Sequence, residues 1–103
     1  MRPDFRRLEW KGFDRFDLDL LRSRGLPCAS PNARRAVLIG RLQRELGLLR
    51  NGGNFAFALA VDGLYGPHTD RELQVEEDAG EPLGPELRQI VDEERSKVNR
   101  FSY

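Results

Sequence analysis

The sequence predicts a mainly α-helical fold, a small helical bundle preceded by an N-terminal arm. One observation is a stripe of leucines, Leu38, Leu42, Leu46 and Leu49, which recur three and four residues apart as on one face of a helix. Another is the placement of proline and glycine at the borders of further apolar runs, where helices start and stop. The 103 residues, 39% hydrophobic and 33% charged, suffice for one small core.

The first two predicted helices each begin with a capping signal. Asp14 is a good N-cap, and Gly25 followed by Pro27 is a common stop. Ser30 and Pro31 together form a strong start for the second helix, which continues through the leucine stripe. On this basis we expect an arm with a short helix over residues 1–29 and the helical domain over 30–103.

The second half of the chain predicts a loop, an extended segment and two helices. The polar glycine-containing segment 51–54 reads as a loop, and apolar residues alternate over 55–61, which leaves open a short β hairpin. A helix is predicted over 67–79, and another begins at Pro85 with an apolar side that runs to Phe101. In the first of these helices the apolar positions, Leu73 and Val75, are sparse. Three glutamates predict an acidic, solvated outer face: Glu72, Glu76 and Glu77.

Charge and cysteine content exclude several classes of protein. Basic and acidic residues number 17 each, so no overall field draws the chain to nucleic acid or to an anionic membrane. The single cysteine, Cys28, allows no internal disulfide. The charged N-terminus lacks the apolar run of a signal peptide, and no segment has membrane-spanning length. We therefore expect synthesis in a cytoplasm.

Aromatic residues are spaced along the N-terminal part of the chain without clear periodicity. Aromatic and arginine side chains are enriched at interface hot spots, although they could equally fold back on the domain's own core. The residues expected to form this interaction arm are Phe5, Trp10, Phe13 and Phe16.

The densest cluster of backbone signals lies between Val61 and Thr69. Asp62-Gly63 indicates a turn, Gly66 can take positive φ, and Pro67 suits the first helical position. Thr69 has capping-box spacing to Glu72. The predicted structural turn motif is Asp62, Gly63, Gly66, Pro67 and Thr69.

This motif resembles the repeat of the bacterial peptidoglycan-binding-like domain, a small three-helix module. The matching residues are Val61, Asp62, Gly63, Tyr65, Gly66, Pro67 and Thr69. Upstream, residues 41–48 are similar to the first helix of that family, where a leucine-glutamine pair precedes a leucine and a glycine. Residues 83–86 look like a degraded second turn, so the resemblance spans about residues 36–91. Glu76 and Glu77 stand where the family usually has a phenylalanine-glutamine pair.

The resemblance implies a non-catalytic module for cell-wall recognition, bacterial or encoded by a bacteriophage, with peptidoglycan as its ligand and no cofactor. Asp62, Tyr65, Arg41 and Arg44 are the expected ligand-binding residues, with the tyrosine ring on a sugar face and arginine on peptide carboxylates. Two alternatives stay open. Tyr65 can instead fill the space beside the turn, and the arginines can form ion pairs on the helix surface.

A second function is compatible with the same fold. The chain can be a structural protein of a bacteriophage particle, such as a capsid or tail cement, decoration or connector protein, whose partners are neighbouring subunits. The arm and the last helix would then contact those neighbours, and the protein would reach the virion by assembly or the cell wall by lysis.

Catalysis and metal binding find little support in the sequence, so we do not expect an enzyme. His68 and Cys28 are the only soft metal ligands, too few for a zinc centre, and we expect a solvated histidine and a half-buried thiol. Asp14, Asp17 and Asp19 lack the glycine and distal glutamate of a calcium loop, and helix-capping and solvated roles explain them better.

Overall fold

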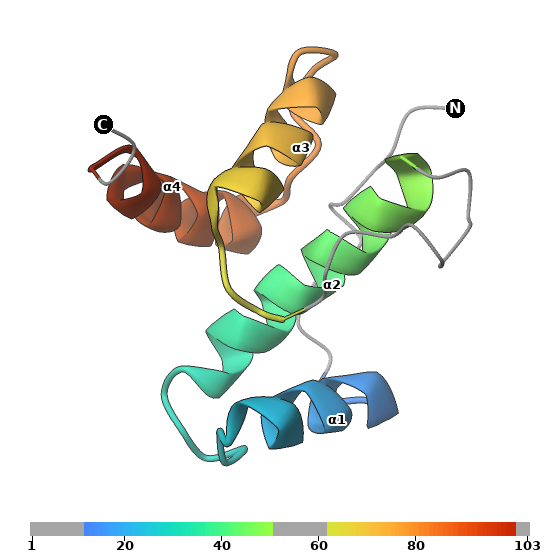
Figure 1. The fold of residues 1–103 in the computed structure, drawn as a ribbon, viewed down its shortest axis with the longest axis vertical. Helices are drawn as coiled ribbons and strands as arrows, with labels where there is room; N and C mark the ends of the chain where they lie inside the picture. Colours follow the sequence, from blue (N-terminus) through green and yellow to red (C-terminus); the bar gives the residue numbers. More distant parts are fainter. Residues whose placement is uncertain (1–11, 51–61, 101–103) are drawn as a thin grey trace. The chain divides into compact units, whose positions relative to one another are not determined.

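A computed structural model of the chain describes residues 12–50 and 62–100 (Figure 1). These residues form four α-helices and contain no β-strand, which confirms the mainly helical prediction. The expected loop over 51–54 and the hairpin over 55–61 lie outside the described residues. The helices are α1 (Arg15–Arg24), α2 (Ala33–Arg50), α3 (Pro67–Glu77) and α4 (Pro85–Arg100).

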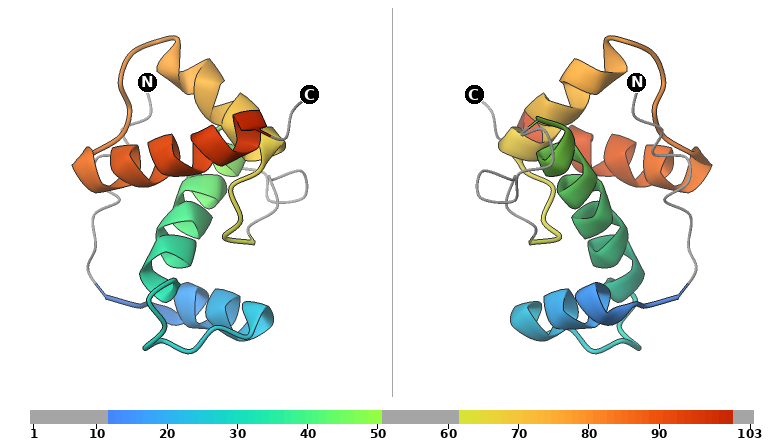
Figure 2. Two further views of the ribbon diagram at one scale, coloured as in Figure 1. Left: turned by 90° about the vertical axis from the view of Figure 1, so that its left-hand side faces the viewer. Right: turned by 90° about the vertical axis from the view of Figure 1, so that its right-hand side faces the viewer.

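The chain divides into two compact units. The described part of the first comprises residues 12–50 and 62–64, with α1 and α2, and is called the α1–α2 unit below. The described part of the second comprises residues 65–100, with α3 and α4, and is called the α3–α4 unit. Figure 2 shows the helices of each unit from two further sides. The expected division of the chain at residue 30 stays a prediction.

α1 has the boundaries that its sequence predicts. The Asp14 carboxylate accepts a hydrogen bond from the backbone N of Asp17 at 2.9 Å, and the Asp17 carboxylate accepts one from the N of Asp14 at 2.8 Å. This reciprocal capping box satisfies two donors of the first turn. Gly25 ends the helix with φ of 65°, the left-handed conformation that glycine adopts without strain.

α2 begins two residues later than the Ser30-Pro31 signal predicts. The Ser30 hydroxyl accepts from the N of Asn32, and the Ser30 carbonyl accepts from the N of Ala33, so the chain turns before the helix starts. A small apolar cluster then joins the two helices of this unit. Its buried members are Leu21, Ala33, Ala36 and Val37, and Phe13 and Leu26 pack against them.

α3 begins at Pro67 as predicted, but its cap differs from the expected one. Gly66 is the N-cap, with an extended φ of −121° and no side-chain cap, so the positive φ expected there is wrong. Gly63 has the positive φ instead, at 71°. Thr69 lies inside the first turn and is buried, so the Thr69–Glu72 capping box is also wrong. The cause is Pro67, whose missing N–H and fixed φ already suit the first helical position.

The glutamates of α3 do not form a fully solvated face. Glu77 is half-buried, with its side chain 19% exposed, and it pairs with Arg88 and Arg95 of α4. Val75, an apolar position of the helix, is in contrast 43% exposed. α3 and α4 are therefore joined by charged contacts. Among the helices described, none combines the length and the apolar character that spanning a bilayer requires.

Candidate functional site

The turn at Asp62 is held by a buried glutamine of α2. Gln43 is 1% exposed, and its side-chain oxygen accepts from the backbone N of Asp62 at 3.1 Å and of Gly63 at 2.9 Å. Its amide nitrogen donates to the Asp62 carboxylate at 3.0 Å and to the Leu64 carbonyl at 2.8 Å. A single side chain thus satisfies donors and acceptors of three consecutive residues, which a buried amide needs to offset its desolvation.

Two further contacts fix the same turn within the α1–α2 unit. The Asp62 carboxylate also accepts from the N of Leu64 at 3.0 Å, and Arg24 at the end of α1 donates to the Asp62 carbonyl at 3.0 Å. Gly63 lies so close to α2 that an added Cβ would be 2.8 Å from the Ala36 carbonyl oxygen. The position therefore requires glycine both for its φ and for its space.

Tyr65 is buried, and its hydroxyl belongs to a polar network in the α3–α4 unit. The hydroxyl donates to Asp70 at 2.6 Å, and the same carboxylate accepts from Gln74 at 2.8 Å and from Arg95 Nε at 2.6 Å. Burial, followed by the hydrogen bond to Asp70, raises the pKa of the Tyr65 hydroxyl. Tyr65 is thus 8% exposed, and its hydroxyl is engaged within its own unit.

The network extends along α4 through the two α3-facing arginines. Arg95 Nη2 donates to Glu77 at 2.7 Å, and Arg88 donates to Glu77 at 2.6 Å and to Glu81 at 2.7 Å. The Glu81 pKa is lowered: partial burial opposes the shift, but the hydrogen bonds from Arg88 and from the backbone of Leu83 outweigh it. In this arrangement the carboxylates of Asp70, Glu77 and Glu81 each form an ion pair with a guanidinium of α4.

Arg41, an expected ligand residue, is engaged inside the α1–α2 unit. Its guanidinium forms an ion pair with the buried Asp17 of α1 and donates to the Gly12 carbonyl at 2.7 Å. The Asp17 carboxylate also closes the capping box with Asp14. Arg41 therefore ties the start of α1 to α2, a contact that the sequence did not predict.

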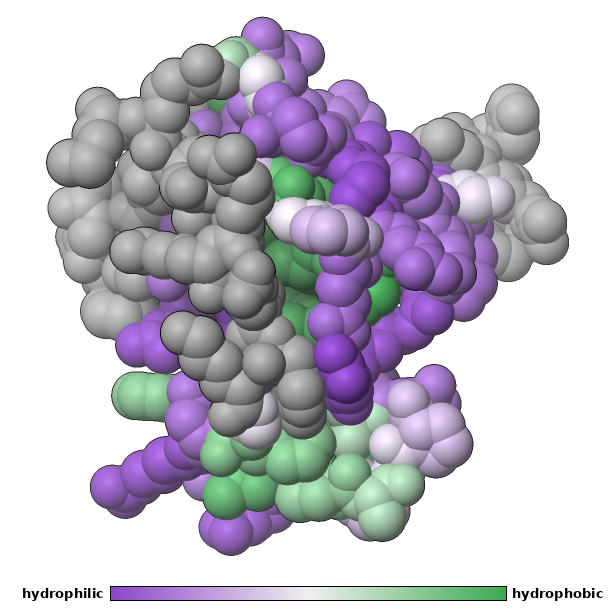
Figure 3. Space-filling view, turned by 180° about the vertical axis from the view of Figure 1, so that it is seen from behind, coloured by the Kyte–Doolittle hydropathy of each residue, from purple (hydrophilic) through white to green (hydrophobic). Residues whose placement is uncertain are grey.

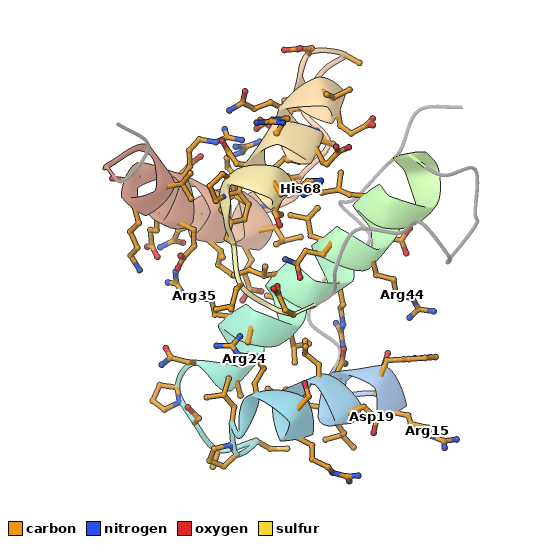
Figure 4. The ribbon with its side chains drawn as sticks, viewed as in Figure 1. Arg15, Asp19, Arg24, Arg35, Arg44 and His68 are labelled. Atoms are coloured by element: carbon orange, nitrogen blue, oxygen red, sulfur yellow. The ribbon has the colours of Figure 1, made fainter. Side chains whose placement is uncertain are left out.

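Arg44 lies on the side of α2 where α1 begins (Figure 4), with its guanidinium 4.3 Å from the centre of the Phe16 ring. Phe16 itself is 63% exposed, and its role in an interaction arm stays a prediction. Phe13 instead packs on the unit's own apolar cluster. The other two arm residues, Phe5 and Trp10, lie outside the described residues.

The two soft side chains lie in different settings. His68 is solvated as expected, with its side chain 76% exposed and Glu72 at 3.9 Å (Figure 4). Cys28 is exposed, so the expected half-buried thiol is wrong, and the reason is its place in the turn between α1 and α2. Over residues 12–50 and 62–100, no group of three or more His, Cys, Asp or Glu side chains could hold a metal ion.

Gln43 is the residue of this site whose role sequence reasoning missed. It follows Leu42 of the leucine stripe and stands four residues after Ile39, so it falls on an apolar face. A glutamine in such a position must be hydrogen-bonded, and that signal could have identified it as the partner of a distant turn. Asp70 and Arg95 carried no comparable local signal.

Comparison with known proteins adds no further constraint. No family model, no curated protein and no solved structure matches this chain.

Proposed function

We propose that this chain is a non-catalytic recognition module of the peptidoglycan-binding-like type, with the bacterial cell wall as its target. The observation that supports the proposal is the contact between Gln43 and the turn at Asp62 and Gly63. These two segments are the ones whose sequence resembles the family, and they meet through four hydrogen bonds of one side chain. A rigid turn of this kind suits a binding surface, because a turn that is already ordered loses little conformational entropy when a ligand binds.

Within this proposal, Asp62 and Tyr65 shape the module and solvated side chains contact the wall. The side-chain polar atoms of Asp62 and Tyr65 form hydrogen bonds within the chain. Arg44, over the largely exposed Phe16 ring, and the exposed Arg71 of α3 are better placed to meet the carboxylates of peptide stems. No step of catalysis is required.

The test is co-sedimentation with insoluble peptidoglycan. We expect the wild-type chain to sediment, and Arg44→Ala and Arg71→Ala each to reduce the bound fraction several-fold. Lys97→Ala removes a similar charge from an exposed position of α4 and should leave binding unchanged. Far-UV circular dichroism of each variant separates lost contacts from lost folding. A folded wild-type chain that stays in the supernatant contradicts wall recognition.

A second candidate is a structural role in a bacteriophage particle, with the same fold used for protein contacts. It is favoured by two facts: the polar atoms of Asp62, Tyr65 and Arg41 are engaged internally, and the Phe16 ring is largely exposed. An exposed aromatic ring beneath an arginine is typical of an interface anchor. If wall binding fails, Phe16→Ser should reduce incorporation of the chain into particles, while Asp19→Ser, an exposed position of the same helix, should not.

A further inference from the structure

The start of α1 leaves an aromatic ring at the surface of the α1–α2 unit. Phe16 is 63% exposed, whereas Phe13, three residues earlier, packs on the apolar cluster of the unit. Leu18 is 42% exposed as well. The lower part of Figure 3 shows apolar side chains gathered at the surface over α1 and the loop after it. Exposed apolar groups that are bordered by polar residues are typical of surfaces that bind a partner.

Two arginines border the Phe16 ring. The guanidinium of Arg44, from α2, lies 4.3 Å from the centre of the ring. Arg15 directly precedes Phe16 in α1 and is exposed. Figure 4 shows Arg15 and Arg44 projecting from the same side of the unit. Because the cation–π contact already orders the Arg44 side chain, that side chain has less rotamer freedom to lose when a partner binds.

The charge around the ring is basic because most of the nearby carboxylates are engaged. Asp14 and Asp17 close the capping box of α1, and Asp17 also forms an ion pair with Arg41. Glu45 of α2 is half-buried and already has a partner. Asp19 is the exposed carboxylate of α1, and it opposes the positive potential of the arginines. The site therefore combines an exposed ring with two cations and one opposing anion.

We propose that the Phe16 ring and its two arginines form a docking site for an acidic segment of a partner protein. An apolar side chain of that segment covers the ring, and carboxylates on either side of it meet Arg15 and Arg44. Aromatic and arginine side chains are the types that most often anchor such contacts. The inference names the chemistry of the partner for the protein-contact role of Phe16 proposed above, so it rests on that role and not on wall binding.

The charge of the site favours this occupant over two others. In a symmetric contact between two copies of the chain, the same surface meets itself, so arginines would face arginines. An anionic membrane would repel Asp19 on the exposed side of α1, whereas a peptide can place its carboxylates away from this residue. An acidic peptide segment is therefore the occupant whose charges fit the site.

The first experiment measures the binding of short labelled peptides to the full chain by fluorescence anisotropy. The first probe has a leucine flanked by glutamates, and two matched probes replace either the glutamates by glutamine or the leucine by serine. We expect the matched probes to bind several-fold more weakly than the first. Raising the salt from 0.1 M to 1 M should also weaken the first probe, because the screening length falls from about 10 Å to about 3 Å. A first probe that stays unbound at millimolar protein, or that binds no better than the glutamine probe, overturns the proposal.

The second experiment repeats the binding of the first probe with variants of the site. Arg15→Gln and Arg44→Gln should each weaken binding about two- to fivefold, and Phe16→Ser about fivefold or more. Asp19→Asn should tighten binding, because it removes the opposing charge. Arg71→Gln removes an exposed arginine of α3 and should leave binding unchanged. Far-UV circular dichroism checks that each variant is folded. Equal weakening by Arg15→Gln and Arg71→Gln overturns the proposal, as does a folded Phe16→Ser that binds like the wild type.

Failure of this inference can be told apart from failure of the functions proposed above. If the acidic probe does not bind but Phe16→Ser still reduces incorporation into particles, the protein-contact role stands and the acidic partner is overturned. Three other occupants are tested with the same variant. Soluble peptidoglycan fragments that displace the probe, phosphatidylserine vesicles that bind the wild type but not Phe16→Ser, and self-association that Phe16→Ser abolishes each assign the ring to another occupant and overturn the proposal.

Discussion

Gln43 places a polar side chain among buried aliphatic residues of α2, and the turn at Asp62 depends on it. Its replacement by alanine would leave the backbone groups of Asp62, Gly63 and Leu64 without their partner and would open a cavity. We expect Gln43→Ala to lower the free energy of unfolding by about 2–4 kcal/mol. Urea denaturation at pH 7 measures the change.

Gln43→Glu is the matched variant of the same size. The introduced carboxylate can still accept from the two backbone N–H groups, but it cannot donate to Leu64 and it faces the Asp62 carboxylate. Its pKa should be raised, so the variant should be destabilised at pH 7 and should regain stability as the pH falls and the group is protonated. Equal stability of this variant and the wild type at pH 7 would contradict the assigned hydrogen bonds.

Gly63 and Gly25 separate two effects that glycine can have. Both have positive φ, at 71° and 65°, but only at Gly63 would an added Cβ approach another backbone atom, the Ala36 oxygen at 2.8 Å. Gly25→Ala should therefore lower stability by only about 1 kcal/mol, the left-handed strain alone. Gly63→Ala adds a steric conflict and should lower it by about 2–4 kcal/mol. Thermal unfolding of both variants checks the order, and similar values for the two would contradict the close approach.

At the scale of the elements, α1 was predictable because both of its ends have local signals. Asp14 caps the first turn and Gly25 ends the last one, and each acts on backbone groups only a few residues away. The start of α2 was not, because the Ser30 hydroxyl bonds to Asn32 and holds a turn, a local alternative to capping. The contact of Gln43 with Asp62 spans 19 residues, so the apolar setting of Gln43 indicates that it needs hydrogen-bond partners but does not specify which turn supplies them.

The capping box of α1 predicts a stability change in acid. The backbone hydrogen bond from Asp17, the largest cause, keeps the pKa of Asp14 below its ordinary value of 3.8. A lowered pKa contributes stability that is present above the ordinary value and is lost as the pH falls through the lowered one. We expect Asp14→Ala to lower stability by about 0.5–2 kcal/mol at pH 7. The deficit should shrink below pH 3.8, as acid denaturation curves would show.

Two variants control for this prediction. Asp14→Asn keeps an acceptor for the Asp17 N–H without a titrating group, so its stability at pH 7 should stay near that of the wild type. Asp19→Ala removes an exposed carboxylate from the same helix and should have little effect at any pH. A deficit in Asp14→Ala that is the same at pH 7 and pH 3 would show that the charge of Asp14 contributes nothing.

At the scale of the whole molecule, composition and arrangement predict different properties. A net charge of zero excludes attraction to nucleic acid through an overall field, and the sequence predicts this directly. The pairing of the half-buried Arg88 and Arg95 with acidic partners depends on how α3 and α4 pack within their unit. That feature required the structure, because the composition does not say which charged residues meet.

The Tyr65 network predicts how the whole chain responds to alkali. Burial and the hydrogen bond to Asp70 raise the pKa of Tyr65 above its ordinary value of 10.0. A raised pKa contributes stability that is fully present below pH 10 and is lost as the pH rises further, because the unfolded chain ionises first. Tyr103→Phe leaves Tyr65 as the sole tyrosine of two, so its absorbance titration reports this group alone.

In Tyr103→Phe, the phenolate of Tyr65 should therefore appear only above pH 10, the ordinary pKa of tyrosine. Its appearance should coincide with the loss of the helical circular dichroism signal. Tyr65→Phe is the matched control, because it keeps the ring but has no group to ionise at this site. Its stability should be lower at pH 7, where Asp70 loses a donor, and should fall less steeply than that of the wild type above pH 10. Ionisation of Tyr65 near its ordinary pKa in a chain that remains helical would show that its hydroxyl is accessible to water and is not held by Asp70.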